Sequence, residues 1–212
     1  MHKATVLLAD DHRMITDAFQ KLLEPQYDVV GTVTDGRALL EQAVALRPDI
    51  TIIDIWMPKL NGLAAGQRLV KTVPKTKIIY ITMSHDGDLA SAALRSGACA
   101  YLLKASAGSE LLKAIDEVLR GRKYVTPIIR NAMEDAFVLC PDPENRVKKL
   151  TPRQVEVLQL LAEGRLMKEV ADILGMTPRT VAFHKYRIME TFGIKSNAEL
   201  IRFAVKQHIL AA

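Results

Sequence analysis

The 212-residue sequence lacks the features that mark several large classes of protein. It holds only two cysteines, Cys99 and Cys140, with neither a CxxC pair nor Cys/His spacing, which argues against a disulfide framework and a structural zinc site. No apolar run reaches the roughly 18 residues of a membrane span. The first apolar run stops at Asp10 and Asp11 and is too short for a signal peptide. These absences predict a cytoplasmic protein with no membrane association.

The composition supplies material for a buried core and a basic C-terminal third. Hydrophobic residues make up 49% and charged residues 25% of the chain, and the length suits one large domain or two ordinary ones. The net charge is +5, and residues 145–212 carry 12 Lys and Arg against six Asp and Glu. Such a basic surface suits a polyanion partner, although on its own it is nearly as common on proteins that bind none.

The first 120 residues alternate between short apolar runs and longer stretches in which apolar residues recur every three or four positions. This pattern predicts five βα repeats, with a parallel sheet covered by helices on both faces. Right-handed crossovers then make a doubly wound α/β domain. The expected strands are Ala4–Ala9, Tyr27–Val33, Ile50–Asp54, Lys77–Thr82 and Cys99–Leu103. The expected helices are Met14–Leu23, Arg37–Leu46, Leu63–Thr72, Leu89–Ser96 and Ser109–Leu119.

The pattern changes after Gly121. Thr126 and Pro127 open a short helix that is expected to end at about Phe137, and the stretch Cys140–Asn145 predicts a loop between domains. We therefore assign residues 1–121 to the α/β domain, 122–149 to a linker with a short helix, and 150–212 to a second domain.

The second domain is predicted to be all helical. A tight turn, Gly175-Met176-Thr177, separates a short helix from a longer one, which is the helix-turn-helix pattern. Thr151, Pro152 and Gln154 form a capping box with a proline at the first helical position. The four expected helices are Pro152–Ala162, Lys168–Leu174, Pro178–Phe192 and Ala198–Lys206.

Three carboxylates stand at the ends of predicted strands. Asp10 and Asp11 follow the first strand, and Asp54 ends the third. Ligands of open parallel sheets bind outside these carboxyl ends, and the strand order 2-1-3-4-5 makes the first and third strands neighbours. Converging carboxylates repel one another unless a cation is bound, and a partly open site with only oxygen ligands favours Mg²⁺.

A hydroxyl and an ammonium group are expected at the same edge. Thr82 ends the fourth strand and Lys104 follows the fifth. Acids, a metal ion, an alcohol and a lysine around one aspartate suit phosphoryl transfer to that aspartate, because positioning and charge neutralisation stabilise its transition state. A single acid at a strand end is most often a solvated turn residue, but the coincidence across four strands argues against that alternative.

The motifs around these residues resemble those of a known family. Together they make the chain similar to two-component response regulators of the NarL/FixJ family, with a LuxR-type helix-turn-helix, over nearly all 212 residues. The resemblance implies a flavodoxin-like receiver domain with strand order 2-1-3-4-5, followed by a four-helix DNA-binding domain. It rests in the first domain on Ala9-Asp10-Asp11-His12, Asp54-Ile55-Trp56-Met57-Pro58, Asn61-Gly62, Ile81-Thr82, Gly97-Ala98 and Tyr101-Leu102-Leu103-Lys104, and in the second on Leu150–Arg153, Glu156–Leu158, Lys168–Ala171, Thr180-Val181, His184 and Ile188-Met189.

The same resemblance implies that Asp54 is the phospho-acceptor, which receives a phosphoryl group from a phosphohistidine of a partner sensor histidine kinase. Asp11, Asp54 and the backbone carbonyl of Trp56 would ligate Mg²⁺, and Asp10 would act through a bound water.

Three further residues match the switch of the family. Lys104 would pair with the phosphoryl group and Thr82 would hydrogen-bond it. Tyr101 matches the aromatic residue that turns inward when the hydroxyl of Thr82 moves toward the phosphoryl group. The alternative for Tyr101 is a half-buried aromatic on an edge strand.

The third helix of the second domain has two distinct faces. A helical wheel places Val181, Ile188 and Phe192 on the buried face, and the opposite face is suited to a major groove. Arginines there would contact phosphates or guanine edges, and aromatics would contact thymine methyls; the alternative is a solvated helix face. The residues expected to contact DNA are Arg179, Ala182, Phe183, Tyr186 and Arg187, with Lys185 near the buried edge, from which its side chain would have to extend around the helix.

One short recognition helix makes few base contacts, so we expect a homodimer on two half-sites of double-stranded DNA. Leu200, Ile201 and Val205 of the last helix suit either the dimer interface or the domain core. The leading hypothesis is a phosphorylation-controlled transcription regulator and not an enzyme. The alternatives are a pseudo-receiver regulator that works without phosphorylation, and an enzyme or adaptor whose helical domain binds protein or RNA.

Overall fold

A computed structural model describes residues 3–139 and 150–210 of the chain. The chain divides into two compact units, Met1–Pro141 and Asp142–Ala212. The predicted loop at Cys140–Asn145, with Cys140 itself, lies outside the described residues. Among the described residues, no helix has both the length and the apolar character that a membrane span requires.

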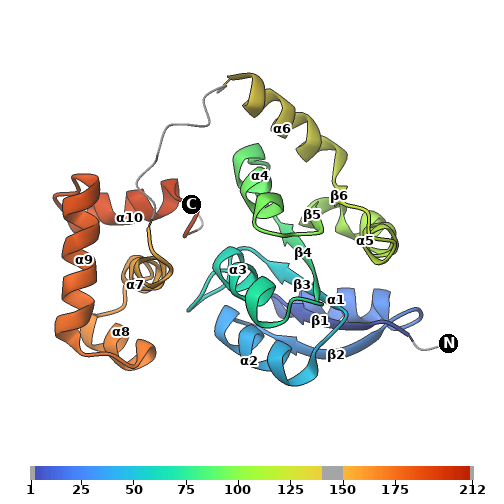
Figure 1. Ribbon diagram of the computed structural model, residues 1–212, viewed down its shortest axis with the longest axis horizontal. Coiled ribbons are helices and arrows are strands. Elements are labelled where there is room, and N and C mark those ends of the chain that lie inside the picture. Colours follow the sequence, from blue (N-terminus) through green and yellow to red (C-terminus); the bar gives the residue numbers. More distant parts are fainter. Residues whose placement is uncertain (1–2, 140–149, 211–212) are drawn as a thin grey trace. The chain divides into compact units, whose positions relative to one another are not determined.

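The first unit is built around a parallel sheet with strand order β2-β1-β3-β4-β5-β6 (Figure 1). This confirms the predicted doubly wound sheet and its order 2-1-3-4-5, and adds a sixth strand that the sequence pattern did not predict. A strand of two residues has no periodicity to detect, and only its pairing with β5 identifies it. The strands are β1 Thr5–Ala9, β2 Asp28–Val33, β3 Ile50–Asp54, β4 Lys77–Thr82, β5 Ala100–Leu103 and β6 Tyr124–Val125.

Helices cover both faces of this sheet because most strand residues are apolar on both sides. On one face, α1 and α5 bury Phe19, Leu23 and Leu111 against the sheet. On the other face, α2, α3 and α4 bury Leu39 and Leu69, among others. The helices are α1 Arg13–Leu23, α2 Gly36–Leu46, α3 Gly62–Thr72, α4 Gly87–Arg95, α5 Lys104–Leu119 and α6 Pro127–Leu139.

Most helix ends differ from the sequence prediction by no more than one or two residues, and two helices differ in ways that matter for the fold. Helix α5 begins at Lys104, five residues before the expected Ser109, because the small residues after Leu103 continue the helix without an apolar repeat to reveal it. Helix α6 reaches Leu139 and packs against α4 (Figure 1). Both β6 and α6, which the sequence placed in a linker, therefore belong to the first compact unit.

The second unit consists of the four expected helices: α7 Pro152–Ala162, α8 Met167–Leu174, α9 Pro178–Phe192 and α10 Asn197–Lys206. Thr151 and Gln154 form the predicted capping box at the start of α7. Gly175 ends α8 with φ 62°, a left-handed conformation that glycine adopts without strain, and Thr177 caps α9 two residues later. The helix-turn-helix is thus defined by residues that stop one helix and start the next.

Two apolar clusters hold the second unit together. One joins α7, α8 and the start of α9 through residues that include Val157, Val170 and Val181. The other joins α7, the second half of α9 and α10 through Leu158, Ile188 and others. In α10, Leu200 is buried in this second cluster, Val205 is half-buried, and Ile201 is 41% exposed.

Candidate functional site

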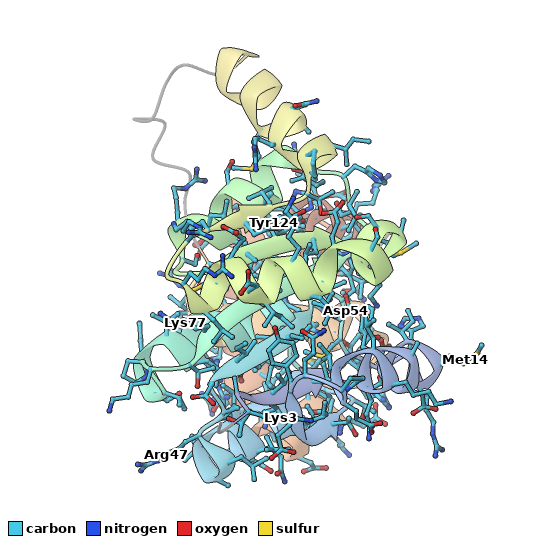
Figure 2. All side chains as sticks on the ribbon, turned by 90° about the vertical axis from the view of Figure 1, so that its right-hand side faces the viewer. Lys3, Met14, Arg47, Asp54, Lys77 and Tyr124 are labelled. Carbon is cyan, nitrogen blue, oxygen red and sulfur yellow. The ribbon has the colours of Figure 1, made fainter. Side chains whose placement is uncertain are left out.

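The parallel register brings the functional side chains of the first unit to one edge of the sheet. Ala9 pairs with Ile53, Asp54 with Ile81, and Thr82 with Leu103. Each of these strands therefore ends at the same level, where the next residue can point beyond the sheet. Figure 2 shows Asp54 on the same side of the unit as Met14, with Lys77 and Arg47 at the opposite side.

A buried lysine joins two of the three acids. The ammonium nitrogen of Lys104 lies 2.8 Å from a carboxylate oxygen of Asp10 and 2.7 Å from one of Asp54. The side chain of Lys104 is 5% exposed, that of Asp10 is 7% and that of Asp54 is 2%. Fifty residues of chain separate Lys104 from Asp54, so only the folded sheet brings this ion pair together.

Asp11 and His12 form the outer part of the same cluster. The Nδ1 atom of His12 lies 2.8 Å from Asp11 and 3.1 Å from Asp10, measured to a carboxylate oxygen. One ligand atom from each of Asp10, Asp11, His12 and Asp54 lies within 4.8 Å of the others. His12 was not among the predicted site residues. Its position directly after the two acids is the feature of the sequence that could have indicated a role in the site. An exposed histidine before a helix does not by itself indicate such a role, because the sequence does not give the direction of its side chain.

Burial controls the protonation of this pocket. Desolvation raises the pKa of Asp54 to about 6, against the lowering effect of Lys104. Burial alone lowers the pKa of Lys104, but its hydrogen bonds to Asp10 and Asp54 outweigh burial and raise that pKa. The buried acids thus carry more negative charge than one lysine neutralises, and additional positive charge would favour the ionised form of Asp54.

The loop after Asp54 packs tightly against it. The backbone N–H of Trp56 donates to a carboxylate oxygen of Asp54 at 3.3 Å, and the N–H of Gly62 donates to the carbonyl of Ile55 at 2.8 Å. A Cβ on Gly62 would overlap with the carbonyl oxygen of Asp54, so only glycine allows this approach. Asn61 caps α3 through the N–H of Ala64. The Asn-Gly pair therefore holds the loop that carries the acid.

Thr82 and Tyr101 lie on the next two strands. The hydroxyl of Thr82 accepts a hydrogen bond from the N–H of Ser84 at 3.1 Å, and Thr82 is fully buried. Tyr101 is also fully buried, so it is not the half-buried edge aromatic considered as an alternative. The reason is β6, which pairs with β5 and removes it from the edge of the sheet. Tyr101 therefore does not need an inward turn to become buried.

A second candidate site lies on α9 in the other unit. Phe183 is 59% and Tyr186 is 62% exposed, whereas Val181 and Ile188 on the opposite face are fully buried. Two large aromatic side chains on an exposed face are unusual unless a partner covers them.

Basic residues accompany these aromatics. Arg179 and Arg187 are exposed, and Arg187 pairs with Glu190 on the same exposed surface at 3.2 Å. Ala182 is half-buried between the two faces. Lys185 is also half-buried and lines a groove with residues of α7, α8 and α10, such as Leu161, and of the connection between α7 and α8, such as Arg165. Among the predicted DNA contacts, Lys185 is thus the one that the structure places away from the exposed aromatics.

Comparison with known proteins identifies both units. The family described as "Response regulator receiver domain" matches residues 6–116, and the family described as "Bacterial regulatory proteins, luxR family" matches residues 148–204. The oxygen regulatory protein NreC of Staphylococcus aureus is 33% identical over 213 residues, which cover 97% of this chain and 98% of NreC.

Solved structures agree with this match. A structure of the response regulator RcsB from Salmonella typhimurium has a TM-score of 0.66 at 26% identity, and covers 96% of this chain and 97% of that chain. A structure of two RcsB dimers bound to two parallel DNAs has a TM-score of 0.59 at 27% identity, and covers 95% and 98%.

The chain belongs to the response regulators that join a receiver domain to a LuxR-type DNA-binding domain. This family consists of transcription regulators and not of enzymes, as the sequence predicted. Receiver domains bind Mg²⁺ at an acidic pocket and have histidine kinases as partners.

Proposed function

We propose that Asp54 is the phospho-acceptor and that its phosphorylation controls binding of the α9 face to DNA. The observation that carries this proposal is the position of Lys104, whose ammonium group bridges Asp10 and Asp54 in a nearly dry pocket. A fixed positive charge beside a buried carboxylate is suited to a dianionic phosphoryl group, because it needs no rearrangement to neutralise the new charge.

The carboxylates of the pocket fit a magnesium ion. Asp11, Asp54 and the backbone carbonyl of Trp56 would hold it, and Asp10 would act through a bound water. The fit rests on the ligand atoms of the acidic cluster, which lie within 4.8 Å of one another, and on the net negative charge of that cluster. When bound, the ion supplies charge neutralisation to the transferred phosphoryl group.

The chemical step is a displacement at phosphorus. A carboxylate oxygen of Asp54 forms a bond to the phosphorus of a phosphohistidine of the partner kinase, the P–N bond breaks, and the imidazole leaves with its electron pair. Lys104, which already lies beside Asp54, pairs with the phosphoryl oxygens, and the hydroxyl of Thr82 donates a hydrogen bond to one of them. The acid must be ionised to attack, so the step is favoured above the pKa of about 6.

The output is a homodimer on DNA with two half-sites. Phe183 and Tyr186 supply apolar contact for bases, and Arg179 and Arg187 supply charge for phosphates or guanine edges. The likeness to RcsB, whose dimers bind DNA, supports a dimer for this chain as well. A regulator of this kind acts in the cytoplasm, where its kinase and DNA are both accessible.

Incubation with a small phosphodonor and Mg²⁺ tests the acceptor. We expect the intact mass of the wild type to increase by one phosphoryl group and that of Asp54→Asn to remain unchanged. Exposed Asp17→Asn is the matched control and should be labelled like the wild type. Labelling that persists in Asp54→Asn, or no labelling of the wild type, would contradict the assignment and favour a pseudo-receiver.

The same samples test the output. Phosphorylated wild type should shift to a dimer in analytical ultracentrifugation and bind a two-half-site duplex more tightly than Asp54→Asn does. A monomer that binds DNA equally well with and without the phosphoryl group would separate DNA binding from phosphorylation.

A further inference from the structure

The segment Tyr124–Leu139, which contains β6 and α6, covers a surface of the receiver unit that would otherwise be open. Helix α6 packs along α4 (Figure 1). The approach is so close that a Cβ on Gly87, the first residue of α4, would overlap with the carbonyl oxygen of Ala132 in α6. The two helices therefore fit at the level of their backbones, which requires glycine at position 87.

Tyr101 lies directly under this segment. Val125 of β6 pairs with Tyr101, and the N–H of Thr126 donates to the Tyr101 carbonyl at 3.1 Å. The side chains of Tyr101 and Ile129 are both 0% exposed and belong to the same apolar cluster, with Met133 packed against it. Tyr101 thus belongs to the apolar cluster into which α6 packs.

Polar contacts attach the same segment to α5 and β5. The Glu110 carboxylate of α5 accepts hydrogen bonds from the hydroxyls of Tyr124 at 3.0 Å and Thr126 at 2.9 Å (Tyr124 is labelled in Figure 2). The Thr126 hydroxyl also accepts from the N–H of Leu103 at 3.3 Å. Leu103 immediately precedes Lys104, so these contacts reach the backbone that positions the pocket lysine.

On the other side, Tyr101 adjoins Thr82. Its phenol oxygen makes no hydrogen bond of regular geometry among the described residues. Burial raises the pKa of Tyr101, and the Thr82 hydroxyl is close enough to oppose that rise. Tyr101 therefore has Thr82 on one side and the β6–α6 segment on the other.

We propose that the β6–α6 segment is an intramolecular ligand of the α4–β5 surface, and that phosphorylation of Asp54 weakens its docking. This inference rests on the proposed function, in which the phosphoryl group draws the hydroxyl of Thr82. Tyr101 follows Thr82 because its buried phenol has no hydrogen-bond partner among the described residues and lies beside the Thr82 hydroxyl, whereas nothing in the proposed step moves its other polar neighbour, Asp86. Its departure removes packing beneath Ile129, and an emptied apolar contact weakens the helix above it.

Release of α6 has two consequences for the whole chain. It opens the α4–β5 surface to a partner or a second copy. It also lengthens the connection to the DNA-binding unit, because α6 leads directly into residues 140–149. Both effects favour a rearrangement of the DNA-binding units after phosphorylation.

Hydrogen exchange with a phosphoryl mimic tests this proposal on the full chain. We expect beryllofluoride with Mg²⁺ to accelerate amide exchange in α6 by about tenfold or more, while α1 and α2 change little. Fluorescence of Trp56, the only tryptophan and two residues from Asp54, reports in the same sample whether the mimic binds.

The two readouts separate the two proposals. A Trp56 response with unchanged or slower exchange in α6 overturns this inference and leaves the acceptor assignment standing. No response in either readout overturns both.

The reciprocal experiment uses a matched pair of glycine substitutions. Gly87→Ala should push α6 away, whereas Gly108→Ala in α5 meets no atom within 4 Å and serves as the control. Because coupling is reciprocal, Gly87→Ala should bind beryllofluoride about fivefold to tenfold more tightly than Gly108→Ala. Equal or weaker binding would overturn the proposal. If Gly87→Ala does not fold, Ile129→Ala weakens the same docking without a clash, and the same expected increase applies.

Discussion

The receiver pocket and the exposed face of α9 both depend on charged residues, but the charges are buried in the pocket and exposed to solvent on α9. In the pocket, Lys104 is held between Asp10 and Asp54, and all three side chains are at most 7% exposed. On α9, the ion pair of Arg187 and Glu190 has side chains that are 58% and 72% exposed. The first arrangement holds charge out of water, and the second leaves it in water.

This difference has a functional meaning. A buried, already oriented lysine can neutralise a phosphoryl group without waiting for solvent to reorganise. Exposed arginines gain little from their carboxylate partners, because solvent screens such pairs, and so they remain available to a polyanion. The comparison predicts that substitutions in the pocket change the free energy of unfolding strongly. Substitutions on α9 should change DNA affinity by smaller amounts.

The largest effect should come from Lys104→Met. The substitution leaves two buried carboxylates without their cation, and breaking such a pair costs about 3–5 kcal/mol of unfolding free energy. Urea unfolding at pH 7.5 measures it, with the exposed Lys21→Met as the matched control. A loss below about 1 kcal/mol would show that water reaches the pocket and would remove the contrast with α9.

The next effect concerns Asp54→Asn and has a defined pH dependence. The folded pKa of about 6 lies above the ordinary value of 3.8, so the folded state keeps a proton that the unfolded state has lost. The tighter proton binding by folded Asp54 contributes to the free energy of unfolding in full below pH 4, and this contribution is lost as pH rises through 6. Without Mg²⁺, Asp54→Asn should therefore be more stable than the wild type at pH 7.5, by at most about 3 kcal/mol at ~1.4 kcal/mol per pKa unit.

Urea unfolding from pH 4 to pH 8 checks the sign as well as the size. The difference between Asp54→Asn and the wild type should shrink toward zero as pH falls to 4. The exposed Asp17→Asn should show no such trend. A wild type that is the more stable protein at pH 7.5 would mean that the pocket solvates Asp54 better than its burial indicates.

A smaller effect is expected on α9, where contacts are made with DNA and not within the protein. The double variant Arg179→Ala/Arg187→Ala should lose about 2 kcal/mol of binding free energy, or ~30-fold in affinity. If both arginines contact phosphates, the slope of log affinity against log salt should also fall by about 0.9 per contact. Fluorescence anisotropy over a salt series measures both.

The matched control is Arg13→Ala/Arg95→Ala, which removes the same charge from exposed positions of the receiver unit. Equal losses in both double variants would mean that total charge, and not the α9 face, determines DNA affinity.

The smallest effect should come from Glu190→Ala. The substitution frees Arg187 from an exposed ion pair that contributes at most about 1 kcal/mol, so DNA affinity should increase by no more than a few-fold. Asp172→Ala, an exposed acid on α8, corrects for the general change in charge. If Glu190→Ala weakens binding relative to that control, the ion pair orients Arg187 for DNA instead of restraining it.

The comparison also shows how far sequence reasoning reached. The sheet order and the placement of Asp10, Asp54 and Thr82 at one edge follow from apolar runs that end in polar residues, because parallel strands end at a common edge. The four helices of the second unit follow from caps and from a 3.6-residue period. These are local signals, and the structure agrees with them.

Other features have no local signal. The strand β6 is too short for a period, and nothing in the composition of α6 shows that it packs on α4. The contact of His12 with two acids depends on a side-chain direction, and the groove beside Lys185 depends on where α10 lies. Each of these results from packing between segments that are distant in the sequence or from a side-chain orientation that the sequence does not specify.

The sequence by itself determined which chemical groups stand at the ends of the strands and which face of α9 carries aromatic and basic residues. Only the tertiary structure decided that Asp54 and Lys104 are nearly dry, that the pKa of Asp54 lies near 6, and that Tyr101 is sealed beneath α6. The physical reason is that residue order sets periodicity and capping locally. Desolvation, in contrast, depends on all the neighbouring atoms that folding brings around a group, because together they exclude water from it.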